Sequence, residues 1–218
     1  MEGNDKMKYI KLFFLLVWLF SYCPSAKAET TGEEYPSLGE SVLESPWSDN
    51  FWTTPENIYL DDAATANVTA ASFDLDDQTY VLKATGFGFS IPAGSTIDGV
   101  ICRVNTWYRP LQGTGSMDLM QLLDTDKTRV GTNQCETPVL LTSNPVTIIE
   151  KGSSTDLWDN SLTVDWVNNA NFGVGLGIIA TDDNADVDVD YVTLEIYYTP
   201  PEGDGKRSRT AVIIQLLK

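Results

Sequence analysis

The sequence predicts an all-β protein, an antiparallel β-sandwich of jelly-roll type with about 8 to 10 strands and at most one short helix. Short runs in which apolar and polar residues alternate follow one another along the chain. Turn residues such as Pro92-Ala93-Gly94 separate these runs. About 190 residues remain after a leader of 28, a length that suits one domain.

The alternating runs predict the strands. In the run VICRVNTW, Val100, Cys102 and Val104 share one face, whereas Arg103 and Asn105 share the other. This pattern is typical of a strand with one buried side. The runs in chain order are TYVLKA (79–84), FGFSI (87–91), VICRVNTW (100–107), MDLMQLL (117–123), VTIIE (146–150), FGVGLGII (172–179) and VTLEIYY (192–198).

One segment, TVDWVNN at residues 163–169, favours a helix of one or two turns, with Thr163 as its cap and Trp166 turned inward. Glycines also lie inside the apolar runs, where they leave room for another backbone or a large ring. We expect Phe87, Phe89 and Phe172 to be those rings.

The termini predict export. Three lysines precede an apolar run at residues 12–20, and Ala26-Lys27-Ala28 is a typical signal-peptidase site, so residues 1–28 are interpreted as a signal peptide. The run is too short for a stable membrane span, although an anchor or a lipoprotein at Cys23 are alternatives. Residues 29–45 are interpreted as a leader of low order, 46–199 as the sandwich and 200–218 as a C-terminal tail.

The charge excludes one class of partner. The whole chain has a net charge of −17, and removal of the leader leaves 10 basic and 29 acidic residues, a net of −19. Such a surface repels phosphate backbones, so no nucleic-acid partner is expected. Cys102 and Cys135 remain after cleavage. In an oxidising compartment they either form a disulfide or stay as two separate buried thiols.

Four stretches of the sequence carry a resemblance: FWTTPENIYLDDAATA, LKATGFGFSIPAGSTIDGVICRV, DLWDNSLTVDWVNNANFGVGLGI and DVDVDYVTLEIYYTPP. Together they resemble a poorly characterised β-sandwich module of exported bacterial proteins and environmental phage structural proteins. The resemblance spans about residues 46–200 and implies the fold, but it implies no catalytic residue. Its elements here include Trp52, Pro55, Phe87, Phe89, Ile91, Pro92, Trp158, Asn171, Phe172, Asp190, Tyr197 and Tyr198.

The chain contains no histidine, which excludes histidine-dependent triads and histidine-ligated metals. A pair of carboxylates, as in glycosidases, is the remaining catalytic alternative. Glu136, Glu150 and Glu195 lie near the later strands, yet none has a local sequence that indicates an apolar pocket.

The acidic stretch DDNADVDVDYV, residues 182–192, has two interpretations. An EF-hand is excluded, because Val187 and Thr193 occupy the positions that need glycine and an acid. Asp186, Asp188 and Asp190 share one parity with the later core residues, so either a bulge near Asp190 reverses the register or the aspartates extend past the sheet. They either bind a structural Ca²⁺, together with a loop such as residues 74–77, or form a solvated acidic edge.

Aromatic residues suggest a ligand surface. Trp107, Tyr108 and Arg109 stand where a strand runs into a loop, and Trp47 lies in PWSDNFW. A ring beside polar groups is typical of a glycan platform, although packing in the core is the alternative for each ring.

The sequence therefore predicts a secreted, non-catalytic protein that presents or binds through its surface, with a glycan or cell-surface component as the expected partner. No cofactor is expected apart from the structural Ca²⁺. One alternative is a structural subunit of a virion or an extracellular filament, which would self-associate through the C-terminal tail. A second is a carboxylate-dependent carbohydrate-active enzyme.

Overall fold

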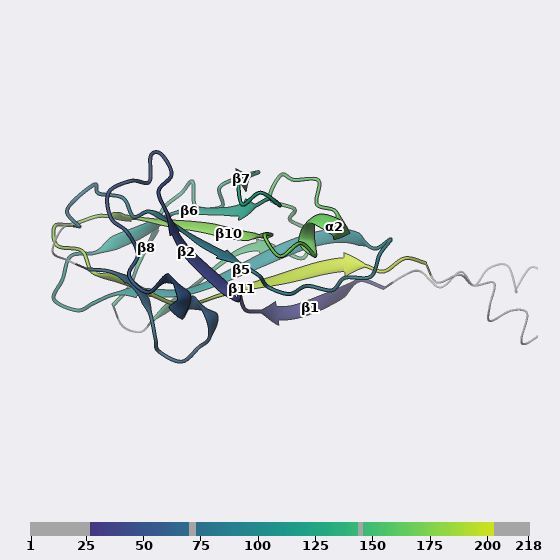
Figure 1. The fold of residues 1–218 in the computed structure, drawn as a ribbon. Helices are drawn as coiled ribbons and strands as arrows, with labels where there is room; N and C mark the ends of the chain where they lie inside the picture. The colour runs from purple at the N-terminus through teal and green to yellow at the C-terminus, as the bar shows by residue number, and fades with distance from the viewer. Residues whose placement is uncertain (1–26, 70–72, 144–145, 203–218) are drawn as a thin grey trace, which may run out of the picture. The chain divides into compact units, whose positions relative to one another are not determined.

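A computed structural model describes residues 27–69, 73–143 and 146–202 (Figure 1). The predicted signal peptide lies outside these residues apart from its last two positions, and so does the C-terminal tail from residue 203 on. Within the described ranges, no helix has both the length and the apolar character that would let it cross a membrane.

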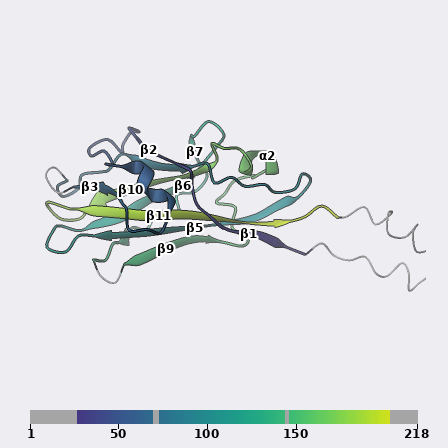
Figure 2. The ribbon, with the colours of Figure 1, turned by 60° about the horizontal axis from the view of Figure 1, so that its bottom comes forward.

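The strands form two antiparallel sheets, which Figures 1 and 2 show as two layers. Sheet A has the order β1-β11-β5-β9, and β3 also pairs with β11. Its strands are β1 (Glu29–Glu34), β3 (Ala66–Val68), β5 (Thr96–Tyr108), β9 (Thr147–Ser153) and β11 (Val187–Thr199). Sheet B has the order β2-β4-β10-β6-β7, and β8 also pairs with β6. Its strands are β2 (Leu38–Val42), β4 (Val81–Thr85), β6 (Gly115–Leu123), β7 (Arg129–Val130), β8 (Val139–Leu140) and β10 (Gly173–Ala180).

The pairing order is that of a jelly roll, which confirms the predicted fold class. Eight strands fold back like one long hairpin: β1 pairs with β11, β4 with β10, β5 with β9, and β6 with β7. Rolling this hairpin places its successive strand pairs alternately in the two sheets. The short strands β2, β3 and β8 extend the sheets around this framework.

The core lies between the sheets and follows the predicted alternation. On β5, Val100, Cys102 and Val104 are fully buried, while Arg103 and Asn105 lie on the outer face of sheet A. Across the layer, Leu122, Leu176 and Ile178 of sheet B are also fully buried.

Two predictions about local structure were wrong. Residues 29–45 are not a low-order leader, because β1 pairs with β11 and β2 pairs with β4. The FGFSI segment is not a strand either. Gly86 and Gly88 have positive φ angles of 75° and 73°, a conformation that interrupts a ladder. Phe87 and Phe89 instead stack in the core with their ring centroids 5.7 Å apart.

The predicted helix at residues 163–169 is present as a single turn, α2 (Val164–Val167), and the Thr163 side chain caps it by accepting the Trp166 amide. A 3₁₀ turn, η1 (Pro55–Tyr59), precedes β3.

The predicted bulge lies at Asp190. Val189 pairs with Thr106, but Tyr191 pairs with Asn105, so Asp190 is the extra residue on β11. The register change lets Val187 and Val189 share the core with Val192, as the first of the two interpretations requires.

Candidate functional site

Trp47, predicted to bind ligand, is a packing residue. It is only 6% exposed and forms a small cluster with Val81 and Leu119 on the outer face of sheet B. Its ring lies over Gly177, where an added Cβ would be 2.6 Å from the indole. The glycine was expected to leave room for a phenylalanine, and the ring that uses the room is Trp47.

The other three predicted ligand residues follow one another at the end of β5, but their side chains do not lie on one face. Tyr108 packs against the core, whereas Trp107 is half-buried on the outer face of sheet A. Arg109 follows, and its guanidinium binds Asp188 through Nε at 2.7 Å and Nη2 at 3.0 Å. All three residues are partly exposed, but Tyr108 packs its ring against the core, so Trp107 and Arg109 are the two that face outward where the sequence places a platform.

The three predicted metal ligands do not converge. Asp188 accepts the Thr65 hydroxyl in addition to Arg109, and Asp186 lies 3.4 Å from the same guanidinium. Asp190 accepts the Ala63 amide at 3.1 Å, on the bulge. In the part of the chain that the structure describes, no group of three or more His, Cys, Asp or Glu residues is placed to hold a metal. Arg109 supplies a positive charge beside Asp186 and Asp188, the role that Ca²⁺ has in one of the two interpretations of the sequence.

Burial governs the electrostatics of this cluster. Burial raises the pKa of Asp186, while Arg109 lowers it in part. Burial also raises the pKa of Asp190, and Asp61 raises it further. Residues 74–77 contact the start of the acidic stretch directly, since the Leu75 amide donates to Asp183 and the Asn184 amide donates to Asp74.

Cys102 and Cys135 are free, buried thiols, which corrects the interpretation as a disulfide. Burial raises the pKa of both, and the pKa of Cys135 reaches about 11. Each thiol behaves as a small apolar group of the core.

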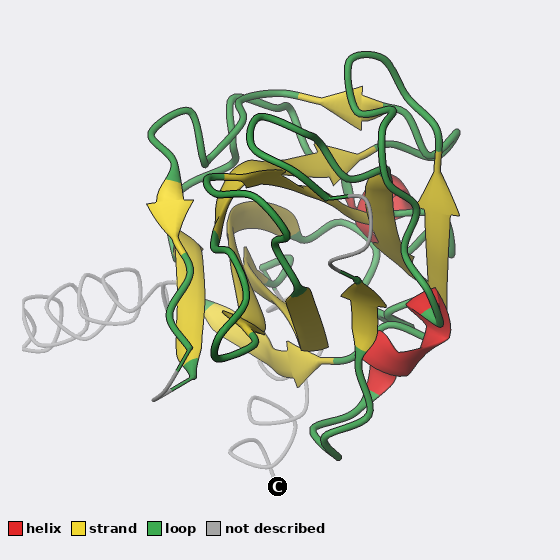
Figure 3. Cartoon of the chain, turned by 90° about the vertical axis from the view of Figure 1, so that its left-hand side faces the viewer, coloured by secondary structure: helices red, strands yellow, loops and turns green. Residues whose placement is uncertain are grey.

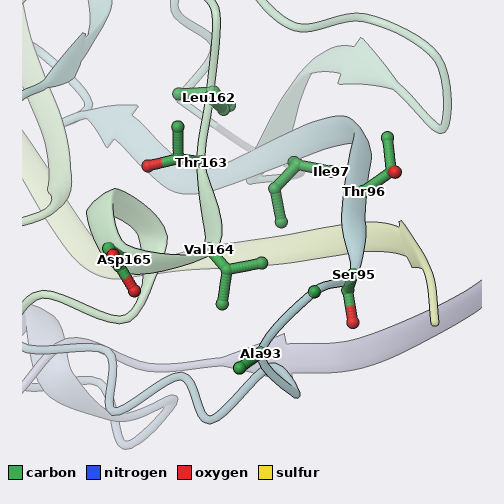
Figure 4. Close-up of a pocket in the computed structure, with 9 residues that line it drawn as sticks. Ala93, Ser95, Thr96, Ile97, Leu162, Thr163, Val164 and Asp165 are labelled. Atoms are coloured by element: carbon green, nitrogen blue, oxygen red, sulfur yellow. The ribbon is translucent and has the colours of Figure 1, made fainter. Parts of the chain in front are cut away.

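Two pockets of the described chain flank α2, at the opposite end of β5 from Trp107. The first, of about 500 Å³, lies between residues 93–97 and residues 162–165. Figure 4 shows Ile97 and Val164 extending into the space between these two segments. In the same view, the side chains of Thr163 and Asp165 point to the opposite side of this segment, away from Ile97.

The second pocket, of about 510 Å³, lies on that other side and shares Thr163 and Asp165 with the first. Its remaining lining comes from the turn after β6, from β7, from α2 and from the turn after α2: Asp124, Thr125, Val130, Trp166 and Asn169. We call the two pockets together the α2 groove.

Three contacts fix the α2 groove to the sandwich. The Asn168 amide group forms two hydrogen bonds of 2.9 Å with the Ile91 backbone, joining α2 to the segment before β5. The Trp166 indole donates to the Leu123 carbonyl at 3.3 Å, and Asn171 donates to the Thr125 carbonyl at 2.7 Å. The walls of the groove are thus held in place without a ligand.

The groove combines the groups that a polyhydroxylated ligand needs. A half-buried indole offers a flat apolar surface, and carboxylate, hydroxyl and amide groups surround it. The sequence assigned Trp166 to packing. Its ring does pack partly against the core, but it also lines the groove. Sequence reasoning did not find Asp124, Thr125, Asp165 or Asn169 as ligand residues, because the fold brings together three segments that carry no shared motif.

Comparison with known proteins gives no family. The chain matches no family model, and no curated protein matches it. One distant structural neighbour is the CBM22-1 xylan-binding domain of Paenibacillus barcinonensis Xyn10C, with a TM-score of 0.38 and 9% identity over 75% of this chain and 95% of that domain. Another is a protein of Bacteroides thetaiotaomicron titled a "putative sugar binding protein", with a TM-score of 0.34 and 8% identity over 80% and 89% of the two chains. Neither similarity is high enough to assign a function.

Proposed function

We propose that the protein binds an uncharged glycan chain, without catalysis, in the α2 groove. The observation that supports this most strongly is the position of Trp166, half-buried beside Asp124, Thr125, Asp165 and Asn169 in a groove fixed by its own hydrogen bonds. Sugars present both apolar C–H faces and hydroxyl groups, so a ring and hydrogen-bonding side chains recognise them together.

The shape favours a chain over a single sugar. Two pockets of about 500 Å³ lie on either side of residues 162–165 and share Thr163 and Asp165. An extended ligand that crosses this segment would contact both pockets. The first pocket contributes the partly exposed Val164, beside the buried Ile97, and a charged ligand does not require such an apolar contact.

The charge favours a neutral ligand. The chain carries 31 acidic and 14 basic residues, and both charged residues that line the groove, Asp124 and Asp165, are acidic. Phosphate, sulfate or uronate groups would be repelled there.

The positions of the carboxylates favour binding without catalysis. A glycosidase keeps one of two facing acids protonated. Glu150 and Glu195 form ion pairs with Arg103 on the outer face of sheet A, away from the groove. Burial raises the pKa of Asp118, Asp186 and Asp190, and none of these three acids lines the groove.

Export remains part of the proposal, because the residues that indicate it, 1–26, lie outside the described chain. A secreted setting would expose the groove to cell-wall or environmental glycans. Assembly through residues 200–218, as in a virion or filament, stays a prediction of the sequence.

The test is native affinity electrophoresis of the purified chain in gels that contain xylan, mannan or mixed-linkage β-glucan. We expect at least one of these polysaccharides to retard the protein and no new reducing ends to appear. Trp166→Ala should weaken retardation about tenfold, equivalent to roughly 1.4 kcal/mol. Asp165→Ala, which removes an exposed side chain, should weaken it less without affecting the fold.

Two matched controls lie away from the groove. Phe51→Ala removes a ring that is 66% exposed, and Glu136→Ala removes an exposed acid. Both should bind as the unmodified protein does. Failure of all three polysaccharides to retard the chain, or equal retardation of the groove variants and the controls, would overturn the proposal.

A further inference from the structure

The far end of β5 carries a second set of groups suited to a glycan. Trp107 lies half-buried on the outer face of sheet A, and Asn105 lies two residues before it on the same face. Across the β5–β9 pairing, Asn105 faces Ile148, whose side chain is 52% exposed. An indole, an amide and an exposed aliphatic side chain therefore lie next to one another. We call this set the Trp107 surface.

The Asn105 amide has an unused acceptor. Its Oδ1 is buried and accepts no hydrogen bond from any residue that the structure describes. A buried acceptor without a donor raises the free energy of the folded state. A small rotation of the side chain toward a ligand hydroxyl would satisfy it.

The cation near Trp107 is already paired. Arg109, two residues further along the chain, is bound by Asp188 at 2.7 Å and 3.0 Å and lies 3.4 Å from Asp186. The guanidinium is thus committed to these carboxylates and does not attract an anion. The Trp107 surface, like the α2 groove, suits an uncharged ligand.

The two sites lie on one rigid strand. Thr96 lines the α2 groove and Trp107 lies 11 residues further along β5, a path of about 36 Å at about 3.3 Å per residue. Strands β9 and β11 pair with β5 on its two sides over most of this length. A short oligosaccharide cannot contact both sites, so each would bind separately.

We infer that the protein is bivalent: a second glycan site at the Trp107 surface, together with the α2 groove, lets one molecule join two glycan chains or two points of one long chain. This inference rests on the proposed function. Binding at two points raises the apparent affinity for a long polymer without new contacts, because the second event becomes intramolecular. The affinity for a short oligosaccharide does not gain in this way.

The experiment uses the polysaccharides of the electrophoresis panel, xylan, mannan and mixed-linkage β-glucan, with Trp107→Ala, Trp166→Ala and the double variant. Mixing the unmodified protein with the polysaccharide that retards it should produce turbidity with a maximum at an intermediate ratio, as cross-linking requires. Each single variant should remain retarded, about tenfold more weakly, and should stay clear. The double variant should not be retarded.

Asn105→Ala and Ile148→Asp provide a second route if Trp107→Ala does not fold, since Ile148 is exposed. Both should reduce turbidity while leaving retardation by the α2 groove in place. A Trp107→Ala protein that binds and cross-links like the unmodified protein would overturn the second site and leave the proposed function standing. Loss of all retardation in either single variant would contradict two independent sites. Absence of retardation in every gel would remove the proposed function, and the inference with it.

Discussion

Arg103 joins all four main strands of sheet A. From β5 its Nε lies 2.7 Å from Glu150 of β9, and its Nη1 lies 2.9 Å from Glu195 of β11 and 3.3 Å from Glu33 of β1. Burial alone would raise the pKa of Glu195, but hydrogen bonds from Arg103 and Thr30 outweigh it and lower that pKa. The Glu195 side chain is 12% exposed, so solvent screens this ion pair little.

The lowered pKa gives a pH dependence with a definite sign. An acid whose folded pKa lies below its unfolded value, about 4.3 for glutamate, stabilises the fold above that pH. The contribution is lost as the pH falls through the lowered folded pKa. Glu195→Gln should therefore cost about 1–3 kcal/mol at pH 7 and progressively less below about pH 4.

Thermal unfolding of the two proteins between about pH 3 and 7 measures this difference. Glu150→Gln is the control, because the Glu150 side chain is 56% exposed and its ion pair should contribute less. A stability difference for Glu195→Gln that stays constant over this range would contradict the role of the carboxylate.

The cysteines give a second prediction at the residue scale. Because burial raises the pKa of both thiols, neither Cys102 nor Cys135 should react with a thiol reagent at pH 8 in the folded protein. In denaturant without reductant, a chain that begins at Glu29 should show two reactive thiols. Fewer than two would indicate a bond that the structure does not contain.

At the scale of elements, one glycine of β10, Gly177, makes room for the Trp47 ring. A Cβ at Gly177 would lie 2.6 Å from the Trp47 ring, whereas one at Gly175 would come no closer than 3.1 Å to a Val81 methyl group. Gly177→Ala should therefore destabilise the fold by about 1–3 kcal/mol, and Gly175→Ala by clearly less.

Denaturant unfolding with tryptophan fluorescence measures both variants. Trp47 should become more exposed only in Gly177→Ala. Glycan binding should survive in both variants, since Trp47 lies outside the α2 groove and the Trp107 surface. A stable Gly177→Ala protein with an unchanged spectrum would show that Trp47 does not pack on this strand.

The sequence predicted an element correctly where nearby residues determine it, as they do for a bulge or a helix cap. The parity of Asp186, Asp188 and Asp190 left either a bulge near Asp190 or aspartates that extend past the sheet, and the structure has the bulge at Asp190. Thr163 caps α2 as expected. Strands β1 and β2 escaped prediction because their ladders are supplied by β11 and β4, and a polar segment such as ETTGEE has no alternation of its own.

The candidate site residues also differ in whether the local sequence indicates them or only the fold brings them together. The sequence predicted Trp107 and Arg109 as ligand residues because they stand where a clear strand runs into a loop; both are partly exposed in the structure, and their binding role stays a prediction. Trp47 was assigned wrongly because the glycine that receives its ring lies at position 177. The α2 groove needed the fold, since Asp124 and Trp166 meet only when the turn after β6 packs beside α2.

At the scale of the whole molecule, the acidic charge supports the proposal of a neutral ligand. The net charge of −17 repels polyanions, while the α2 groove and the Trp107 surface present rings, hydroxyls and amides that an uncharged ligand could contact. Figure 3 shows the loops at the end of the sandwich where β5 ends. The α2 helix lies at the other end of the sandwich.

This arrangement predicts binding that is insensitive to salt. Raising NaCl from about 0.05 M to 0.5 M should change the affinity for the retarding neutral polysaccharide by less than about twofold, because screening acts only between charges. Electrophoresis mobility ratios at the two salt concentrations measure this. Affinity that falls steeply with salt would indicate a charged ligand instead.

Nuclear magnetic resonance titration of isotope-labelled protein, with short oligosaccharides cut from the retarding polysaccharide, tests the central claim most directly. The account predicts amide shift changes concentrated at residues 93–97, 124–125 and 162–169, which line or adjoin the α2 groove. Saturable binding that leaves these amides unchanged would contradict it.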